Sequence, residues 1–109
     1  MPTMQDSATV GANAVSANLL AGLLYEFLPA QAAIRLACTG AATGLRTTFL
    51  VGGVSLINDQ AIGLQNRFPI IPDDIMGEFG GDSGDRLILT FRNTTGAGIV
   101  VFWRVDVDF

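Results

Sequence analysis

The sequence predicts an all-β fold, a single antiparallel β-sandwich preceded by an extended N-terminal arm. Three observations support this prediction. Apolar and polar residues alternate with the period of two that a half-buried strand requires. Turn signals rich in glycine, asparagine and threonine separate the alternating segments at short intervals. The length of 109 residues suits one domain, which would bury roughly 65% of the surface that the unfolded chain exposes.

The N-terminal part carries the least regular pattern. Residues 1–18 are small and polar without a sustained period, and we interpret them as a flexible or extended arm. The sandwich domain then spans residues 19–109. The apolar residues of segment 19–28 fit helical spacing, although the run that ends before Pro29 also suits a strand. The shortness of the segment and its β-rich surroundings favour the strand.

The next segments alternate more clearly. Residues 34–38 predict a strand in which the thiol of Cys38 is buried and structural. Residues 46–51 are rich in threonine, phenylalanine and valine and predict a second strand. The pair Gly52-Gly53 indicates a bulge or a tight bend, after which residues 54–57 resume the extended pattern.

Turn and loop signals dominate the middle of the chain. Asn58-Asp59 predicts a turn. Residues 68–71 predict a short strand, and its prolines place it at a sheet edge or in an extended connection. Residues 72–85 are acidic and glycine-rich, and they predict the longest loop of the protein.

The last two segments, 86–92 and 98–109, predict a β-hairpin around the turn signal Asn-Thr-Thr-Gly-Ala. Two registers fit this hairpin, one with Arg86 opposite Asp106 and one with Arg86 opposite Arg104. The first is favoured because opposite charges across a ladder attract and like charges repel. Both registers place the same apolar side chains on one face, which is the predicted core: Leu87, Leu89, Phe91, Ile99, Val101, Trp103 and Val105.

The other face of this predicted hairpin is a candidate interface. Ile88, Val100 and Phe102 are large and apolar where a solvated face would be polar, and Arg92 and Arg104 lie beside them. Charged residues make up only 15% of the chain, against the usual ~25%. We therefore expect this face to be covered, either by a segment of the same chain such as the N-terminal arm or by a neighbouring subunit, and we predict a homo-oligomer with these five residues in its interface.

The composition excludes most catalytic chemistry. All six basic residues are arginine, so the chain has neither histidine nor lysine. The commonest general base, the commonest metal ligand and the amine of Schiff-base catalysis are thus missing. Residues 81–84 spell Gly-Asp-Ser-Gly, the surroundings of the nucleophile in trypsin-like proteases. Ser83 nevertheless has no histidine or lysine to take its proton, and a turn explains the tetrapeptide. We expect a protein that is not an enzyme and that has no cofactor.

The residue pattern also bears on calcium, nucleic acid and membranes as partners. Acidic residues between 73 and 85 allow an alternative function, a monomeric binding module whose loop holds calcium, but their spacing matches no known calcium motif. These residues are Asp73, Asp74, Glu78, Asp82 and Asp85. The arginines are scattered and the net charge is −4, which disfavours nucleic acid. Since no run approaches the ~20 apolar residues of a spanning helix, a membrane partner is not expected either.

The polar arm, the compact run of strands and the final segment GDRLILTFRNTTGAGIVVFWRVDVDF together resemble the small structural proteins of virus particles, of coat or decoration type. The resemblance covers residues 24–109 in pattern. It implies a jelly-roll-like sandwich that works by repetition, with copies of itself and other virion proteins as partners and the virion as its location. It implies no catalytic residues.

Overall fold

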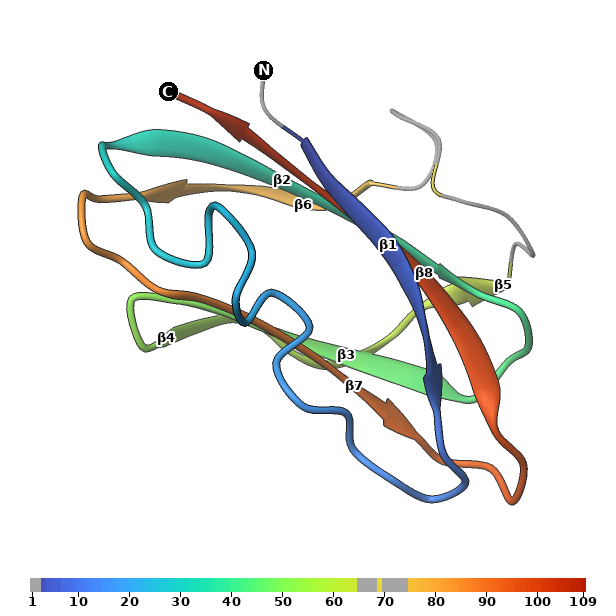
Figure 1. Ribbon diagram of the computed structural model, residues 1–109. Coiled ribbons are helices and arrows are strands. Elements are labelled where there is room, and N and C mark those ends of the chain that lie inside the picture. Colours follow the sequence, from blue (N-terminus) through green and yellow to red (C-terminus); the bar gives the residue numbers. More distant parts are fainter. Residues whose placement is uncertain (1–2, 65–68, 70–74) are drawn as a thin grey trace.

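The computed structural model describes residues 3–64, 69 and 75–109, and it shows two β-sheets that face each other (Figure 1). Sheet A consists of β1 (Thr3–Val10), β8 (Ile99–Asp108), β2 (Ala32–Gly40), β6 (Ile75–Gly81) and the two-residue β5 (Gly63–Leu64). Sheet B consists of β4 (Val54–Ala61), β3 (Leu45–Val51) and β7 (Leu87–Asn93). In sheet A, β8 lies between β1 and β2, and β2 also pairs with β6 and β5. The predicted all-β sandwich is confirmed.

The core lies between the two sheets and follows from the alternation along their strands. In β3, every second residue is buried, and β7 and β8 repeat that pattern. The rings of Phe49 in β3 and Phe79 in β6 meet across the gap with centroids 5.8 Å apart. Burying a phenylalanine or leucine side chain contributes about 1.5–3 kcal/mol, so these two layers stabilise each other through their apolar faces. The predicted core residues are all buried: Leu87, Leu89, Phe91, Ile99, Val101, Trp103 and Val105.

Several local predictions are confirmed as well. Residues 34–38 lie in β2, and the thiol of Cys38 is buried. Gly52 and Gly53 have φ angles of 60° and 85°, which residues with a side chain rarely adopt. They form a two-residue hairpin turn that joins β3 to β4, the connection that such a glycine pair favours.

The predicted hairpin between the last two strands is wrong. Strand β7 pairs with β3 in sheet B, whereas β8 pairs with β1 and β2 in sheet A. Arg86 consequently lies opposite Phe27, while Asp106 lies opposite Thr3 on one side and Arg35 on the other. The alternation of apolar residues is the same for a hairpin and for two strands that face each other across the core. The connection of residues 94–98 is long enough to cross the ~10 Å between layers, and a cross-strand charge pair contributes at most about 1 kcal/mol.

The predicted N-terminal arm also differs from the structure. Residues 3–10 form β1, which pairs with β8 along its full length, from Thr3 opposite Asp106 to Val10 opposite Ile99. Only two residues of this strand, Met4 and Val10, are buried. The alternation of apolar residues in this strand is weak for that reason. The strand is held mainly by its backbone hydrogen bonds to β8.

Segment 19–28 is neither the favoured strand nor a helix. It is a series of turns with one isolated bridge, between Phe27 and Arg86. Leu20 and Leu28 are buried at its two ends, and the apolar residues between them are mostly exposed. The apolar run therefore reflects two anchors and a surface loop, and no continuous buried face.

Two further turn predictions are wrong. Asn58 and Asp59 lie within β4, where they form a bulge opposite the single residue Thr48, and Asp59 has a φ of 52°. Residues 75–81 of the predicted acidic loop form β6 at the side of β2. The predicted strand 68–71 and the acidic residues Asp73 and Asp74 lie outside the described residues, except for Pro69.

The segment between β1 and β2 closes one edge of the sandwich. In Figure 1 it runs along β7 before it rises to sheet A. The amides of Ser16 and Leu19 donate to the carbonyls of Phe91 and Leu89, and the amide of Leu87 donates to the carbonyl of Glu26. The outer edge of β7 is thus bonded without a further strand. This arrangement blocks pairing with other chains at that edge.

Candidate functional site

The five predicted interface residues do not share one face. Val100, Phe102 and Arg104 lie on the outer face of sheet A, and Ile88 and Arg92 lie on the outer face of sheet B. The predicted single patch divides because β7 and β8 belong to different sheets. The structure therefore offers two separate outer faces where the sequence indicated one.

The outer face of sheet A carries a row of charged residues near the end of β8. Asp106 is buried, and its Oδ1 accepts hydrogen bonds of 2.8 Å from Arg104 Nε and from Thr3 Oγ1. Arg35 of β2 lies between Asp106 and Glu78 in the ladder. A buried carboxylate requires such partners. The carboxylate of Asp106 therefore has a structural role within sheet A.

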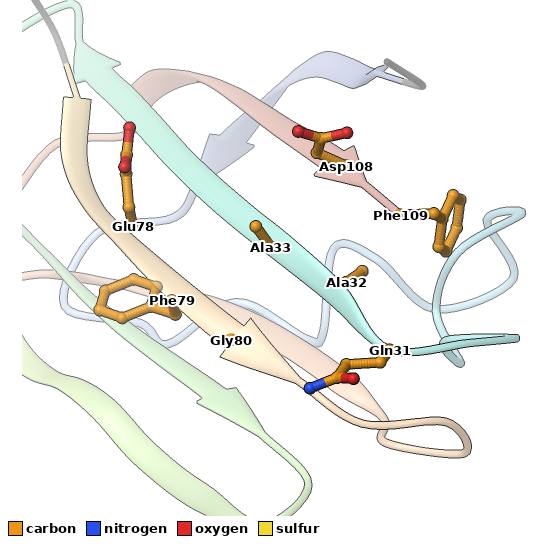
Figure 2. Close-up of a pocket in the computed structure, with 8 residues that line it drawn as sticks. All are labelled: Gln31, Ala32, Ala33, Glu78, Phe79, Gly80, Asp108 and Phe109. Atoms are coloured by element: carbon orange, nitrogen blue, oxygen red, sulfur yellow. The ribbon is translucent and has the colours of Figure 1, made fainter.

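A shallow groove of about 540 Å³ lies at the same end of sheet A. Figure 2 shows Glu78 and Asp108 on strands that flank β2, with Ala33 between them. Ala33 pairs with Gly80 on one side and Asp108 on the other, so small residues form the floor. Gln31 and Phe109 stand at the open end of the groove. The groove can receive a cationic or amphipathic group from outside.

The outer face of sheet B carries an ion-pair cluster. Arg46 and Arg92 lie directly opposite each other on β3 and β7. Asp59 accepts two hydrogen bonds from Arg92, of 3.0 Å from Nε and 2.7 Å from an Nη nitrogen, and its Oδ2 lies 3.3 Å from Arg46 Nε. The hydrogen bonds from Arg92, followed by the charges of both arginines, lower the pKa of Asp59 below its usual value. The ion pairs therefore link the three strands of sheet B, β4, β3 and β7.

The loop 22–28 presents apolar side chains at the end of the sandwich that carries the groove. Leu24 is 81% exposed and Phe27 is 57% exposed. Arg86 lies over the ring of Phe27 at 5.8 Å and pairs with Glu26 at 2.8 Å. The hydrogen bond from the amide of Gly22, with the contribution of Arg86, lowers the pKa of Glu26. The loop is therefore held in one shape although its apolar side chains face solvent.

The Gly-Asp-Ser-Gly tetrapeptide forms a turn. The amide of Asp82 donates to the carboxylate of Asp85, and Gly84 has a φ of 88°. The hydroxyl of Ser83 donates to the carbonyl of Pro29 at 3.2 Å, which ties the turn to the segment before β2. The arrangement matches the turn interpretation of these residues.

The remaining candidate sites are placed as follows. Glu78 lies on β6, and Asp82 and Asp85 lie in the turn after it. Within residues 3–64, 69 and 75–109, no group of three or more histidine, cysteine, aspartate or glutamate side chains is arranged to hold a metal ion. Residues 93–95, Asn-Thr-Thr, also spell the acceptor sequence for N-glycosylation. Asn93 is 1% exposed, and its Nδ2 donates to the carbonyls of Val10 and Ala97.

Comparisons with known proteins identify no family for this chain. No protein-family model matches it, and no curated protein matches it by sequence. In the part of the chain that the structure describes, no helix is long and apolar enough to span a membrane.

Sequence reasoning missed the groove and the exposed loop beside it. The groove is assembled from β2, β6 and β8, so no local pattern of the sequence signals it. The loop did carry a signal, because it contains three large apolar residues besides the two that are buried: Leu23, Leu24 and Phe27. The same apolar run also fits a strand, and the strand was the wrong interpretation.

Proposed function

We propose that the protein is a structural subunit that assembles with copies of itself, as a capsid or capsid-decoration protein of a virus particle. The observation that carries this proposal is the apolar surface of so small a sandwich. Eight large hydrophobic side chains of the described residues are at least 37% exposed: Val15, Leu23, Leu24, Phe27, Val54, Leu56, Leu64 and Phe109. Apolar groups that gather on the surface of a soluble protein mark interaction sites.

The roles of the arginines support a structural function. Arg46 and Arg92 hold Asp59, Arg86 holds Glu26, and Arg104 holds Asp106. Each pair joins different strands or fixes a loop, except that Arg104 and Asp106 lie on one strand. Guanidinium groups are favoured at protein interfaces because they are weakly hydrated and bind carboxylates through two donors.

The energetics of association set the area that such contacts must bury. Apolar burial contributes about 25 cal/mol per Å², and association costs roughly 4–15 kcal/mol before any contact is formed. A stable interface buries about 800 Å² on each partner. One exposed side chain is thus insufficient, and a cluster with polar contacts at its rim is required. The two outer faces that carry Val100, Phe102, Arg104, Ile88 and Arg92 remain part of the proposal as separate surfaces.

Light scattering coupled to size-exclusion chromatography tests the proposal directly. We expect a mass above the 11.5 kDa of one chain, and we expect it to rise with concentration. Electron micrographs of the concentrated protein then distinguish closed particles from smaller oligomers. A monomer at every concentration, up to about 1 mM, contradicts self-assembly, since this range detects even weak association.

A further inference from the structure

Three strand edges of the sandwich, those of β7, β4 and β1, are poor sites for self-association. The edge of β7 is capped by the segment between β1 and β2. Strand β4 contains two register shifts within eight residues, and β1 carries Asp6 opposite Trp103, on its core-facing side. Bulges and inward-facing charges are the devices by which natural sheets prevent edge-to-edge pairing. Contacts between copies are therefore disfavoured at these three edges.

Among the described residues, half of the exposed large hydrophobic side chains lie at one end of the sandwich. We call it the Phe27 end, and it comprises residues 22–33, 80–86 and 108–109. Leu28 exchanges backbone hydrogen bonds with Gly84 and Asp85, so the exposed loop and the turn after β6 are joined. The ring of Tyr25 lies 5.3 Å from that of Phe109, which stands at the mouth of the groove. The apolar loop and the groove are therefore continuous.

The Phe27 end is also fixed before any partner arrives. Leu20 and Leu28 anchor the loop in the core, and Glu26 accepts from Gly22 and Arg86. A loop that is already ordered loses little conformational entropy on binding. Exposed aromatic and arginine side chains on such a support are the usual centres of binding energy at interfaces.

Charge and shape at this end are complementary to each other. Arg86 contacts Glu26 through Nε and one Nη nitrogen, and its side chain is still 46% exposed, so further donors of the guanidinium face solvent. The groove offers the carboxylate of Asp108 above a floor of Ala33 and Gly80, whereas Glu78 lies directly opposite Arg35 in the ladder. A guanidinium together with an aromatic ring fits that combination of a carboxylate and small apolar residues.

We infer that the Phe27 end is a twofold interface, in which each copy inserts Arg86 and Phe27 into the groove of a second copy. Arg86 and Phe27 lie at the same end of the sandwich as the groove. A twofold rotation can therefore place these two side chains of each copy in the groove of the other. The inference rests on the proposed self-assembly and names its surface. The partner is a second copy of this chain because this chain supplies both halves of the complementary pair.

Phe27→Asp tests the apolar half of this interface, with Val15→Asp as the matched control. Val15 is 62% exposed and Phe27 is 57% exposed, but Val15 forms a bridge with Arg92, at the opposite end of β7 from Arg86. We expect Phe27→Asp to raise the dimer dissociation constant at least about tenfold in sedimentation equilibrium, and Val15→Asp to leave it unchanged. Equal effects of the two variants contradict the inference.

A reversed ion pair tests the charged half. In the double variant Glu26→Arg/Arg86→Glu, the ion pair within one copy is kept with its charges exchanged, although the amide of Gly22 loses its acceptor. Position 86 now repels the groove, so we expect dissociation to increase at least about tenfold. Adding Asp108→Arg to that double variant is expected to restore association, while melting temperatures show that all variants fold.

The outcomes separate the inference from the function on which it rests. A wild-type chain that stays monomeric overturns both. A wild-type chain that assembles, but is unaffected by Phe27→Asp and by the reversed pair, overturns only the Phe27 end. Recovery of dimers on addition of Asp108→Arg supports the groove as the site that receives position 86.

Discussion

Arg46 and Arg92 lie directly opposite each other on the outer face of sheet B, and the carboxylate of Asp59 joins them. Like charges at opposed positions of a ladder destabilise a sheet. The bulge of β4 resolves the conflict, because it carries Asp59 into reach of both guanidinium groups. A local irregularity of the edge strand thus stabilises the middle of the sheet.

Asp59→Asn is expected to lower the melting temperature, because the arginines then face each other without a compensating charge. Asparagine tolerates the positive φ of this position, so the variant changes the charge and keeps the backbone. Added salt should recover part of the loss by screening the repulsion. Asp82→Asn, at an exposed turn position, serves as the control. A melting temperature equal to that of the wild type would show that the cluster contributes nothing.

Stability is expected to fall on acidification through Asp59 and Glu26. The pKa of each group is lowered in the folded protein, by the hydrogen bonds from Arg92 in one case and from Gly22 in the other. The unfolded chain therefore takes up these protons first as the pH falls. The contribution is complete above the unfolded values of about 4 and is lost as the pH drops through the lower folded values.

Urea unfolding between roughly pH 7 and pH 2.5 measures this dependence. The double variant Glu26→Gln/Asp59→Asn should show a shallower decline below about pH 4 than the wild type. The chain contains no histidine, so little change is expected between about pH 6 and pH 8. An identical acid slope for both proteins would be inconsistent with the predicted roles of these carboxylates.

Asn18→Ala is expected to weaken the capped edge of β7. The side chain of Asn18 accepts from the amides of Leu20 and Leu89 and donates to the carbonyl of Leu87. Leaving such groups without partners costs about 1–3 kcal/mol, which chemical denaturation would detect. Asn18→Asp keeps the acceptor and should cost less. The alanine variant should also aggregate more readily, because a bare strand edge can pair with other chains.

Asn93 is expected to stay unmodified in a cell that glycosylates Asn-Thr-Thr sequons. Its Nδ2 is buried and donates to Val10 and Ala97, while its Oδ1 accepts from the amide and hydroxyl of Thr95. Mass spectrometry of the secreted protein checks this prediction. Asn93→Ala should cost about 2 kcal/mol in urea unfolding, because it removes partners of buried groups. A glycosylated, normally stable product would contradict both expectations.

The sequence predicted the fold class because alternation reports which side chains face a core. Leu87, Phe91 and Trp103 were correctly placed inside. The same alternation says nothing about which strand lies beside which, since β7 and β8 bury the same residues in a hairpin or in two sheets. The pairing was decided by partners far along the chain, such as β1 for β8 and β3 for β7.

The candidate site was less predictable for related reasons. Ala33, Gly80 and Asp108 are neighbours only through the ladder of β6, β2 and β8, and small residues carry no periodic signal. Asp59 was assigned to a turn because the bulge that uses it depends on Arg92, 33 residues away. Local reasoning identifies elements, whereas sites formed across strands depend on register.

The pairing of β1 with β8 constrains how the protein is made. During synthesis β1 leaves the ribosome well before its partner, residues 99–108. Contacts over so long a separation close late. A chain that stops before β8 lacks the strand between β1 and β2, and proteases should digest it quickly. Sheet A is therefore completed only when β8 joins β1 to β2.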